Sequence, residues 1–214
     1  MITLRVEVPY ASFRKSFARS FAETYPLPPP ATVYGMLLSL VGERFRQRHA
    51  GVRLAFAYKR IPQVATTLRK LSRYKYGVAA KQSKLGNAPD FIETLCGIEF
   101  LCWVDSTDEP QTEPTLESRI VEALQHPDTV NRYGLLCLGL SDDAVNEVSL
   151  CPSIEGVWHR LLPDIAGSIE LPVWVDHVGS AKTRWHRFSM EKEATPLATQ
   201  PGDVDWQWTV MSAP

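Results

Sequence analysis

Hydrophobic and polar residues alternate over residues 2–9, where Leu4, Val6 and Val8 are separated by charged side chains. A hydrophobic period of two residues is typical of a strand that buries one face and exposes the other. The segment therefore predicts a half-buried β-strand. It also lacks the basic region and the long apolar region of a secretory signal peptide, so we expect none.

Apolar residues then recur at intervals of three and four residues between 31 and 49, directly after three consecutive prolines at 28–30. Proline is tolerated in the first turn of a helix and disfavoured inside a helix or a central strand. Arg44, Arg46 and Arg48 would lie in the last turns, where the helix dipole favours positive charge. The pattern predicts one helix over residues 31–49 behind a rigid proline turn.

Shorter hydrophobic segments predict further strands and one more helix. The expected elements are strands at 52–59, 92–104 (kinked near Gly97) and 133–140, a helix at 116–125 that stops before Pro127, and short strands at 147–150, 171–176, 181–188 and 206–211. The main elements follow the order β-α-β, a long insertion at 59–90, and β-α-β. This order predicts an α+β fold with a ferredoxin-like or RRM-like core, in which two helices back a sheet.

The same pattern divides the chain into two parts. Residues 1–145 form the expected RRM-like domain with its insertion, and residues 146–214 form a β-rich C-terminal extension. All six tryptophans lie at or after Trp103, and we expect them to cover the sheet or a small C-terminal subdomain.

The net charge of −1 hides a strong segregation of charge along the 214 residues. Residues 1–84 hold 16 Lys and Arg against 3 Asp and Glu, a net charge of +13, whereas the remainder holds 7 against 21, a net charge of −14. Segregated positive charge is typical of a surface that binds a polyanion. The first part of the chain therefore predicts nucleic-acid binding.

Composition narrows the class of protein further. Hydrophobic residues make up 44% and charged residues 22%, which is ordinary for a soluble globular protein. No apolar run reaches the roughly 18 residues that span a bilayer, so we expect no membrane contact and a cytoplasmic location. The four cysteines contain no Cys-x-x-Cys pair, which disfavours zinc and disulfides, and we expect no cofactor.

The insertion at 59–90 carries the side chains from which we predict an RNA-binding site. Lysine and arginine would contact phosphates, and tyrosine would stack on unpaired bases. The candidates are Tyr58, Lys59, Arg60, Arg69, Lys70, Arg73, Tyr74, Lys75, Tyr76, Lys81 and Lys84. Gly77 and Gly86 would allow the backbone to approach RNA closely. The alternative is a solvated basic loop without a ligand.

The segment at 25–43 resembles the N-terminal motif of the Cas-five RAMP proteins, the type I CRISPR Cascade subunits that cap the 5′ handle of the guide RNA. In that family a strand, a Phe/Arg loop, a proline turn and a helix with Gly-x-Leu-x-x-x-x-Gly follow one another. Here Phe13-Arg14 and Gly35…Gly42 match. Residues 133–143, which contain Leu138-Gly139-Leu140-Ser141, resemble a later strand and turn of the family. The combination is most similar to the Myxan or Dev-type branch.

This resemblance implies an RRM-like fold with a thumb-like insertion and a non-catalytic role in a surveillance complex. The implied partners are the 5′ handle of the crRNA, the Cascade backbone subunit, the large subunit, and target DNA near the PAM. In the family, the region after the first strand meets nucleic acid, which adds Arg14, Lys15 and Arg19 to the RNA-binding candidates. Gly35 and Gly42 are expected to be close-packing positions. Whether the complex serves defence or transposition stays open.

Catalysis is the main alternative, because some members of the family cleave pre-crRNA with a Tyr, a Lys and an adjacent His, without metal. None of the five histidines follows a lysine here. His49, near Tyr34, is the best candidate for an acid–base group, and a surface helix cap is the competing interpretation. A generic RNA-binding or translation-linked protein with an RRM-like sheet is a third interpretation.

Overall fold

The computed structural model describes residues 1–15, 21–72, 87–110, 113–132, 134–197 and 208–213. Its strands are β1 (Ile2–Ala11), β2 (Phe21–Ala22), β3 (Arg53–Tyr58), β4 (Gln63–Ser72), β5 (Asn87–Asp105), β6 (Glu147–Leu150), β7 (Val157–Pro163), β8 (Ile169–Trp174), β9 (Arg184–Met190), β10 (Thr195–Pro196) and β11 (Thr209–Val210). Its helices are α1 (Pro30–Leu40) and α3 (Leu116–Gln125), with short 3₁₀ helices at Arg46–His49 and Pro127–Thr129. The predicted α+β class is confirmed.

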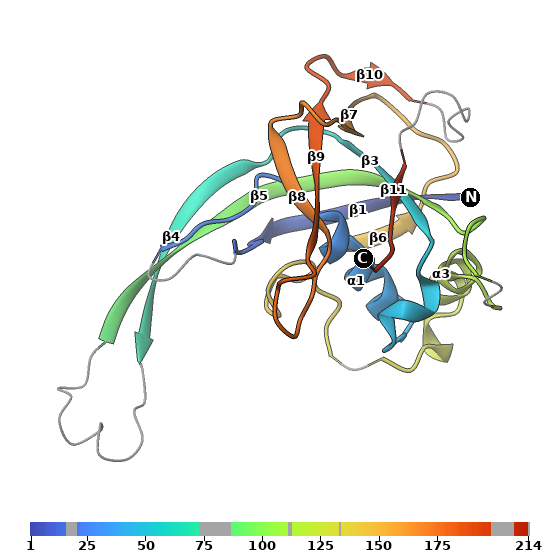
Figure 1. The fold of residues 1–214 in the computed structure, drawn as a ribbon, viewed down its shortest axis with the longest axis horizontal. Coiled ribbons are helices and arrows are strands. Elements are labelled where there is room, and N and C mark those ends of the chain that lie inside the picture. Colours follow the sequence, from blue (N-terminus) through green and yellow to red (C-terminus); the bar gives the residue numbers. More distant parts are fainter. Residues whose placement is uncertain (16–20, 73–86, 111–112, 133, 198–207, 214) are drawn as a thin grey trace.

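The strands form one mostly antiparallel sheet in the order β6-β1-β5-β3-β7-β9-β8. The short strand β2 runs parallel to β5, and β4 pairs with the first half of β5. The late strands β7, β9 and β8 therefore extend the sheet that the early strands begin, beside β3 (Figure 1). Two predicted strands appear here slightly displaced, 171–176 as β8 and 181–188 as β9, while β7 was missed.

Helix α1 begins as predicted and ends nine residues early. Pro30 occupies its first turn, after Pro29 in an extended conformation. At the other end Gly42 adopts φ +68°, and the Gly42 and Glu43 N–H groups donate to the Ser39 and Leu38 carbonyls. This pair of bonds is a Schellman motif, which stops a helix. The prediction of one helix over 31–49 is therefore wrong, and the three arginines lie after it, Arg46 and Arg48 in a 3₁₀ helix.

Helix α3 coincides with the prediction over 116–125. Thr115 caps it, since its hydroxyl accepts a hydrogen bond from the Ser118 N–H at 3.3 Å. The 3₁₀ turn that starts at Pro127 follows directly. The buried residues of α3 are Leu116, Ile120 and Ala123. A cap, a helical hydrophobic period and a proline stop agree here, and for that reason the sequence predicted both ends correctly.

The described part of the predicted strand at 133–140, residues 134–140, is instead an irregular segment. Leu136 and Leu138 are buried, which accounts for its apolar alternation. Gly139 has φ +115° and packs so closely on the backbone of Ser12 that a Cβ would lie 2.9 Å from its carbonyl oxygen. Asp143 fixes the turn, because its Oδ2 accepts from the N–H groups of Ser12 and Leu140 at 2.7 and 2.8 Å. Turn geometry overrides the strand pattern.

The predicted strand at 92–104 lies within the longer strand β5, and Gly97 is its kink, with φ +68°. On the C-terminal side of Gly97, β5 pairs with β3, and on the N-terminal side it pairs with β4. Strand β4 and residues 87–96 of β5 form a long arm that extends from the rest of the molecule (Figure 1), hereafter the arm. Strands β1 and β2 also pair with β5 toward its base.

The sheet is buried on both faces near β3 and β5. The main core lies between the sheet and the two helices and includes Leu54, Phe56 and Phe100. A second hydrophobic cluster lies on the opposite face, where Trp103 packs with Trp158. Trp208 also packs against this cluster, so tryptophans do cover the sheet as expected. Of the predicted strand at 206–211, only the part from residue 208 onward is described.

Candidate nucleic-acid interface

Much of the predicted RNA-binding set falls where side chains are not described. Arg19, Arg73, Tyr74, Lys75, Tyr76, Lys81 and Lys84 lie outside the described residues, as do Gly77 and Gly86. For Arg69 and Lys70 only the backbone is described, and it pairs with Asp90 and Pro89 in the arm. The side chains with a described position are those of Arg14, Lys15, Tyr58, Lys59 and Arg60.

Arg14 and Lys15 follow the end of β1. Arg14 is exposed and forms an isolated bridge with Thr24, while the Lys15 Nζ lies 3.0 Å from the Glu23 carboxylate. This segment is tied to the base of the arm, since the Ser12 hydroxyl donates to the Glu93 carbonyl at 2.8 Å. The two basic residues therefore lie beside the arm.

Lys59 and Arg60 lie where the arm leaves the sheet. The Arg60 Nε donates to the carbonyl of Gly97 at 3.3 Å, and a Cβ on Gly97 would lie 2.9 Å from the Arg60 guanidinium. The Lys59 Nζ lies 4.6 Å from the ring centroid of Trp158, a cation–π contact. Gly97 thus permits both the kink and the position of Arg60, which is exposed.

Tyr58 must be removed from the set of stacking side chains. Its exposed fraction is 0%, and its ring centroid is 5.6 Å from that of Phe100 in the core. Burial raises the pKa of its hydroxyl, which has no hydrogen-bond partner among the described residues. A base cannot stack on this ring in the folded protein. The signal was present in the sequence, because Tyr58 continues the buried alternation of Leu54 and Phe56.

The arm carries exposed apolar side chains that the sequence reasoning missed. Strand pairing aligns Phe21 of β2, Phe91 of β5 and Leu68 of β4 in one row across the arm. Their exposed fractions are 43%, 41% and 60%. The rings of Phe21 and Phe91 lie 6.3 Å apart. Exposed apolar side chains that lie side by side are typical of surfaces that contact a partner. The alternation of Val64, Thr66 and Leu68 was its signal.

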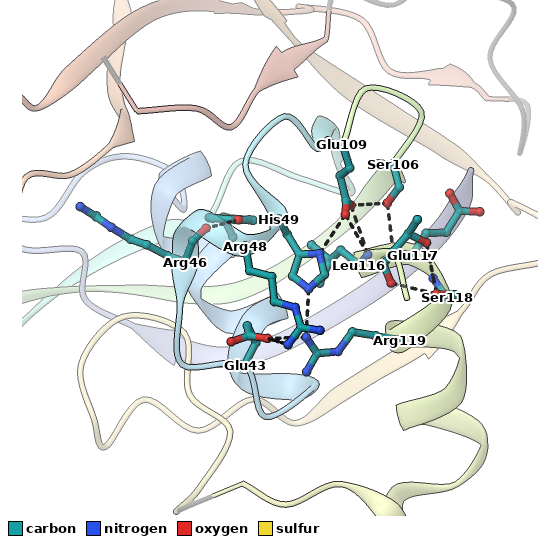
Figure 2. A network of polar contacts seen from close by, with 12 residues as sticks. Glu43, Arg46, Arg48, His49, Ser106, Glu109, Leu116, Glu117, Ser118 and Arg119 are labelled. Carbon is teal, nitrogen blue, oxygen red and sulfur yellow. Dashed lines mark hydrogen bonds and ion pairs between the residues drawn. The ribbon is translucent and has the colours of Figure 1, made fainter. Parts of the chain in front are cut away.

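His49 is buried, with an exposed fraction of 0%, which overturns its interpretation as a surface helix cap. Figure 2 shows its polar network. Its Nδ1 lies 2.8 Å from the Glu109 carboxylate, and its Nε2 lies 3.0 Å from Nη1 of Arg119. A carboxylate only accepts and a guanidinium only donates, so Nδ1 carries the hydrogen and Nε2 accepts. Both ring nitrogens are occupied within the protein, and neither faces solvent.

The network continues from Arg119 to Glu43, just after α1. Nη1 of Arg119 lies 2.5 Å from the Glu43 carboxylate, and Nη2 donates to the Val41 carbonyl at 3.0 Å. Burial alone would raise the pKa of Glu43, but the hydrogen bond from the Phe45 N–H and the Arg119 guanidinium outweigh it and lower the pKa to about 2. The carboxylate is therefore ionised, and the network joins α1 to α3.

No binding site for a metal emerges from the described part of the chain, where no three His, Cys, Asp or Glu side chains are grouped. The four cysteines are free thiols. Within the same residues, none of the helices is long and apolar enough to cross a membrane.

Comparison with known proteins identifies the class. A family model described as CRISPR-associated protein (Cas_Cas5) matches residues 1–133. The CRISPR-associated protein Cas5 of Myxococcus xanthus (strain DK1622) is 40% identical over 196 residues, which cover 90% of this chain and 91% of that protein. The chain is thus a CRISPR-associated protein.

Two solved structures share the fold at low sequence identity. A chain of a CRISPR RNA-guided surveillance complex matches with a TM-score of 0.64 at 14% identity, over 95% of this chain and 94% of that one. A Cas protein crystal structure matches with a TM-score of 0.53 at 14% identity, over 91% and 94%. With the sequence matches, the chain belongs to the Cas5 family, which confirms the resemblance stated on the motif at 25–43.

Proposed function

We propose that this protein is a non-catalytic RNA-binding subunit of a type I Cascade surveillance complex and that it caps the 5′ handle of the crRNA. It would dock the backbone subunit and the large subunit near the PAM of the target DNA, and guide pairing would supply the sequence specificity. Family membership and the fold shared with a surveillance-complex chain support this assignment.

The arm is the observation that carries the proposal. Its strand β4 is exposed over 63–68 on both faces, so it contributes little to the core and much to accessible surface. In the sequence, the most basic segment, residues 69–84, begins at the end of β4 and precedes β5. Lysine and arginine there would neutralise phosphates, and tyrosine would stack on unpaired bases. An exposed arm next to such a sequence suits a single-stranded RNA.

The topology supports a ferredoxin-like core. The elements β1, α1, β3, β5, α3 and β6 follow one another along the chain, and their strands stand in the order β6-β1-β5-β3, all antiparallel. That is the arrangement of a β-α-β-β-α-β unit. The predicted division into a core over 1–145 and an extension over 146–214 stays part of this proposal, with its boundary moved to the end of β6 at Leu150, because β6 is the last strand of this unit.

The generic RRM-like alternative is less favoured, because RRM proteins stack bases on aromatic side chains of the open sheet face. Here that face is covered at β3 and β5: Trp103 is 0% exposed and Trp158 is 3% exposed. The endoribonuclease alternative is also less favoured, since His49 is buried and both its nitrogens are bonded. Neither alternative function gives the arm a role, whereas the capping function does.

The test compares binding of two RNAs, one with an intact and one with a scrambled 5′ handle, to the co-expressed complex in EDTA. The variant Lys70→Ala, Arg73→Ala, Lys75→Ala removes three positive charges from the arm region. The variant Lys182→Ala, Arg187→Ala, Lys192→Ala removes the same charge from exposed positions in the C-terminal part and serves as the control. A denaturing gel reports any cleavage.

We expect selective binding of the intact handle, a loss of at least about tenfold in the arm variant, and little change in the control. Each lost phosphate contact on a single strand should also reduce the slope of log K against log salt by about 0.7. Equal binding of both RNAs would contradict the capping role. RNA that is cut by the wild type and left intact by His49→Ala would instead favour the nuclease.

A further inference from the structure

Three cavities lie in a row along the exposed side of α1. Their volumes are about 350, 330 and 580 Å³. The first and second share Thr32, Gly139 and Val175 in their linings, and the second and third share Gly35 and Ser39 among others. Because neighbouring cavities share walls, they form one continuous depression, hereafter the α1 groove.

Small residues of α1 line the floor of the α1 groove. Thr32, Gly35 and Ser39 are spaced along one side of the helix, and Gly35 is exposed. A Cβ built on Gly35 would meet nothing within 4 Å, so its predicted role as a close-packing residue is wrong. Gly42, by contrast, does pack closely, since a Cβ there would lie 2.5 Å from the Asn131 carbonyl oxygen. The helix backbone at Gly35 is open to a ligand.

The rim of the α1 groove is positively charged. Arg14 lines one end, and Arg44, Arg46 and Arg132 line the other. Glu43 is the one carboxylate among the described lining residues, and Arg119 and Arg48 already neutralise it. The Arg46 guanidinium lies 4.6 Å from the ring centroid of Trp174, which holds it in place. This balance of charge favours a polyanion over an acidic or neutral peptide surface.

Aromatic rings are available at both ends of the α1 groove. At the Arg14 end, Tyr25 and Trp185 have ring centroids 6.0 Å apart, and Trp185 is 38% exposed. At the other end Phe45 is 71% exposed. Exposed rings between arginines are the combination that binds single-stranded nucleic acid, because the rings stack on bases and the guanidinium groups contact phosphates.

The Arg14 end of the α1 groove adjoins the base of the arm. Ser12, which lines the first cavity, donates from its hydroxyl to the Glu93 carbonyl in β5 at 2.8 Å. Thr24, the bridge partner of Arg14, donates from its N–H to the Glu93 carboxylate at 3.0 Å. A strand that follows the arm toward the body of the protein therefore arrives at the groove.

We propose that the α1 groove holds a segment of single-stranded RNA that continues from the arm, with its phosphates near Arg14, Arg46 and Arg132 and its unpaired bases against the aromatic rings. This inference rests on the proposed function and extends it to a second binding surface. The floor at Gly35 would allow the RNA to pass close to the helix backbone.

The test is the substitution Gly35→Leu, with Gly35→Ala as its matched control, in the co-expressed complex. Both variants should fold, because the Cβ position is open and a helix interior prefers either residue to glycine. Leu fills the floor of the α1 groove and Ala does not. We expect Gly35→Leu to lower the affinity for guide RNA about tenfold and Gly35→Ala to leave it unchanged. Arg132→Ser, at an exposed rim position, should reduce the salt slope by about 0.7.

The outcomes separate this inference from the proposed function. Handle selectivity in the wild type with wild-type affinity in Gly35→Leu would overturn the groove inference and leave the capping role standing. Equal binding of intact and scrambled handles by the wild type would contradict the capping role. The difference in RNA affinity between Gly35→Leu and Gly35→Ala would still show whether RNA lies in the α1 groove. If Gly35→Leu kept its affinity for RNA and lost a protein subunit from the complex, the occupant would be a protein segment and the inference would be wrong.

Discussion

At the scale of single residues, the most constrained side chain is His49. Its Nδ1–H donates to Glu109 and its Nε2 accepts from Arg119, so one buried ring joins two charged groups from distant parts of the chain. Glu109 in turn accepts from the Leu116 N–H at the start of α3 and from the Ser106 hydroxyl (Figure 2). The geometry assigns His49 a structural role.

We therefore predict that His49→Ala lowers the free energy of unfolding by about 2–4 kcal/mol, because it opens a cavity and takes one hydrogen-bond partner each from the Glu109 carboxylate and the Arg119 guanidinium. Urea denaturation at pH 7 measures this. The control His126→Ala, at an exposed position, should change stability by less than about 0.5 kcal/mol. An undiminished stability of His49→Ala would show that the network contributes little.

A second prediction at this scale concerns acid. The pKa of Glu43 is about 2 in the folded protein against an ordinary value of 4.5. A depressed pKa stabilises the fold above pH 4.5, and that stabilisation disappears as the pH falls toward 2. It amounts to about 3 kcal/mol at most. Unfolding free energies between pH 6 and pH 2.5 should fall less steeply for Glu43→Gln than for the wild type. Parallel curves would contradict the assignment.

At the scale of elements, the ends of helices and strands were predicted correctly only where the residues that terminate them are recognisable in the sequence. Helix α3 carried a cap, a hydrophobic period and a proline stop between Thr115 and Pro127, and both its ends were predicted correctly. Helix α1 carried its stop in a single glycine, Gly42, and the apolar pattern that continues to Phe45 concealed it. Gly139 had the same effect on the segment at 133–140. A glycine with positive φ ended the element at Gly42 and shaped the turn at Gly139, whereas Gly97 only kinks β5.

Three glycine substitutions test this account. Gly42→Ala combines φ +68° with a Cβ 2.5 Å from a backbone oxygen, so we expect a loss of at least about 2 kcal/mol in unfolding free energy. Gly134→Ala has φ +77° but open space, and should lose about 1 kcal/mol. Gly35→Ala should gain about 0.5–1 kcal/mol. Thermal and urea unfolding of the three variants would contradict the account if their order differed.

The arm and the buried network show what sequence could not supply. The basic content of residues 59–84 indicated a nucleic-acid surface. The strand β4 was missed because its short alternation of Val64, Thr66 and Leu68 lies inside a segment that otherwise has no clear period. The partners of His49 lie 60 and 70 residues further along the chain. Contacts at such separations leave no local pattern. For Tyr58 a local pattern did exist. It continues the alternation of Leu54 and Phe56, which predicts a buried ring, and this pattern is stronger evidence than its position next to Lys59.

At the scale of the whole molecule, the part that forms the core and the part that we propose binds RNA are largely separate. The core lies between the sheet and the two helices, and it includes Leu95 at the base of the arm. Farther out, β4 is exposed over residues 63–68. Joining Lys70 to Pro89, which are paired across the arm, through Asn-Gly in place of residues 71–88 would close a short hairpin. We expect the shortened protein to keep its melting temperature within a few degrees and to lose most of its affinity for handle RNA.

Circular dichroism and an RNA-binding titration measure these two properties separately. The triple variant Lys182→Ala, Arg187→Ala, Lys192→Ala controls for charge in the same titration. A shortened protein that unfolds at a much lower temperature would mean that the arm supports the core. Retained affinity for handle RNA would place the RNA elsewhere on the molecule.

The most direct test of the central claim maps which guide nucleotides touch this chain inside the assembled complex. Guide RNAs that carry a single photoreactive 5-iodouridine, placed in turn along the 5′ handle and the spacer, are irradiated in the complex, and cross-linked peptides are identified by mass spectrometry. The account predicts cross-links from handle positions to peptides of the arm and of the α1 groove. Cross-links confined to the spacer, or none to this chain from the handle, would contradict it.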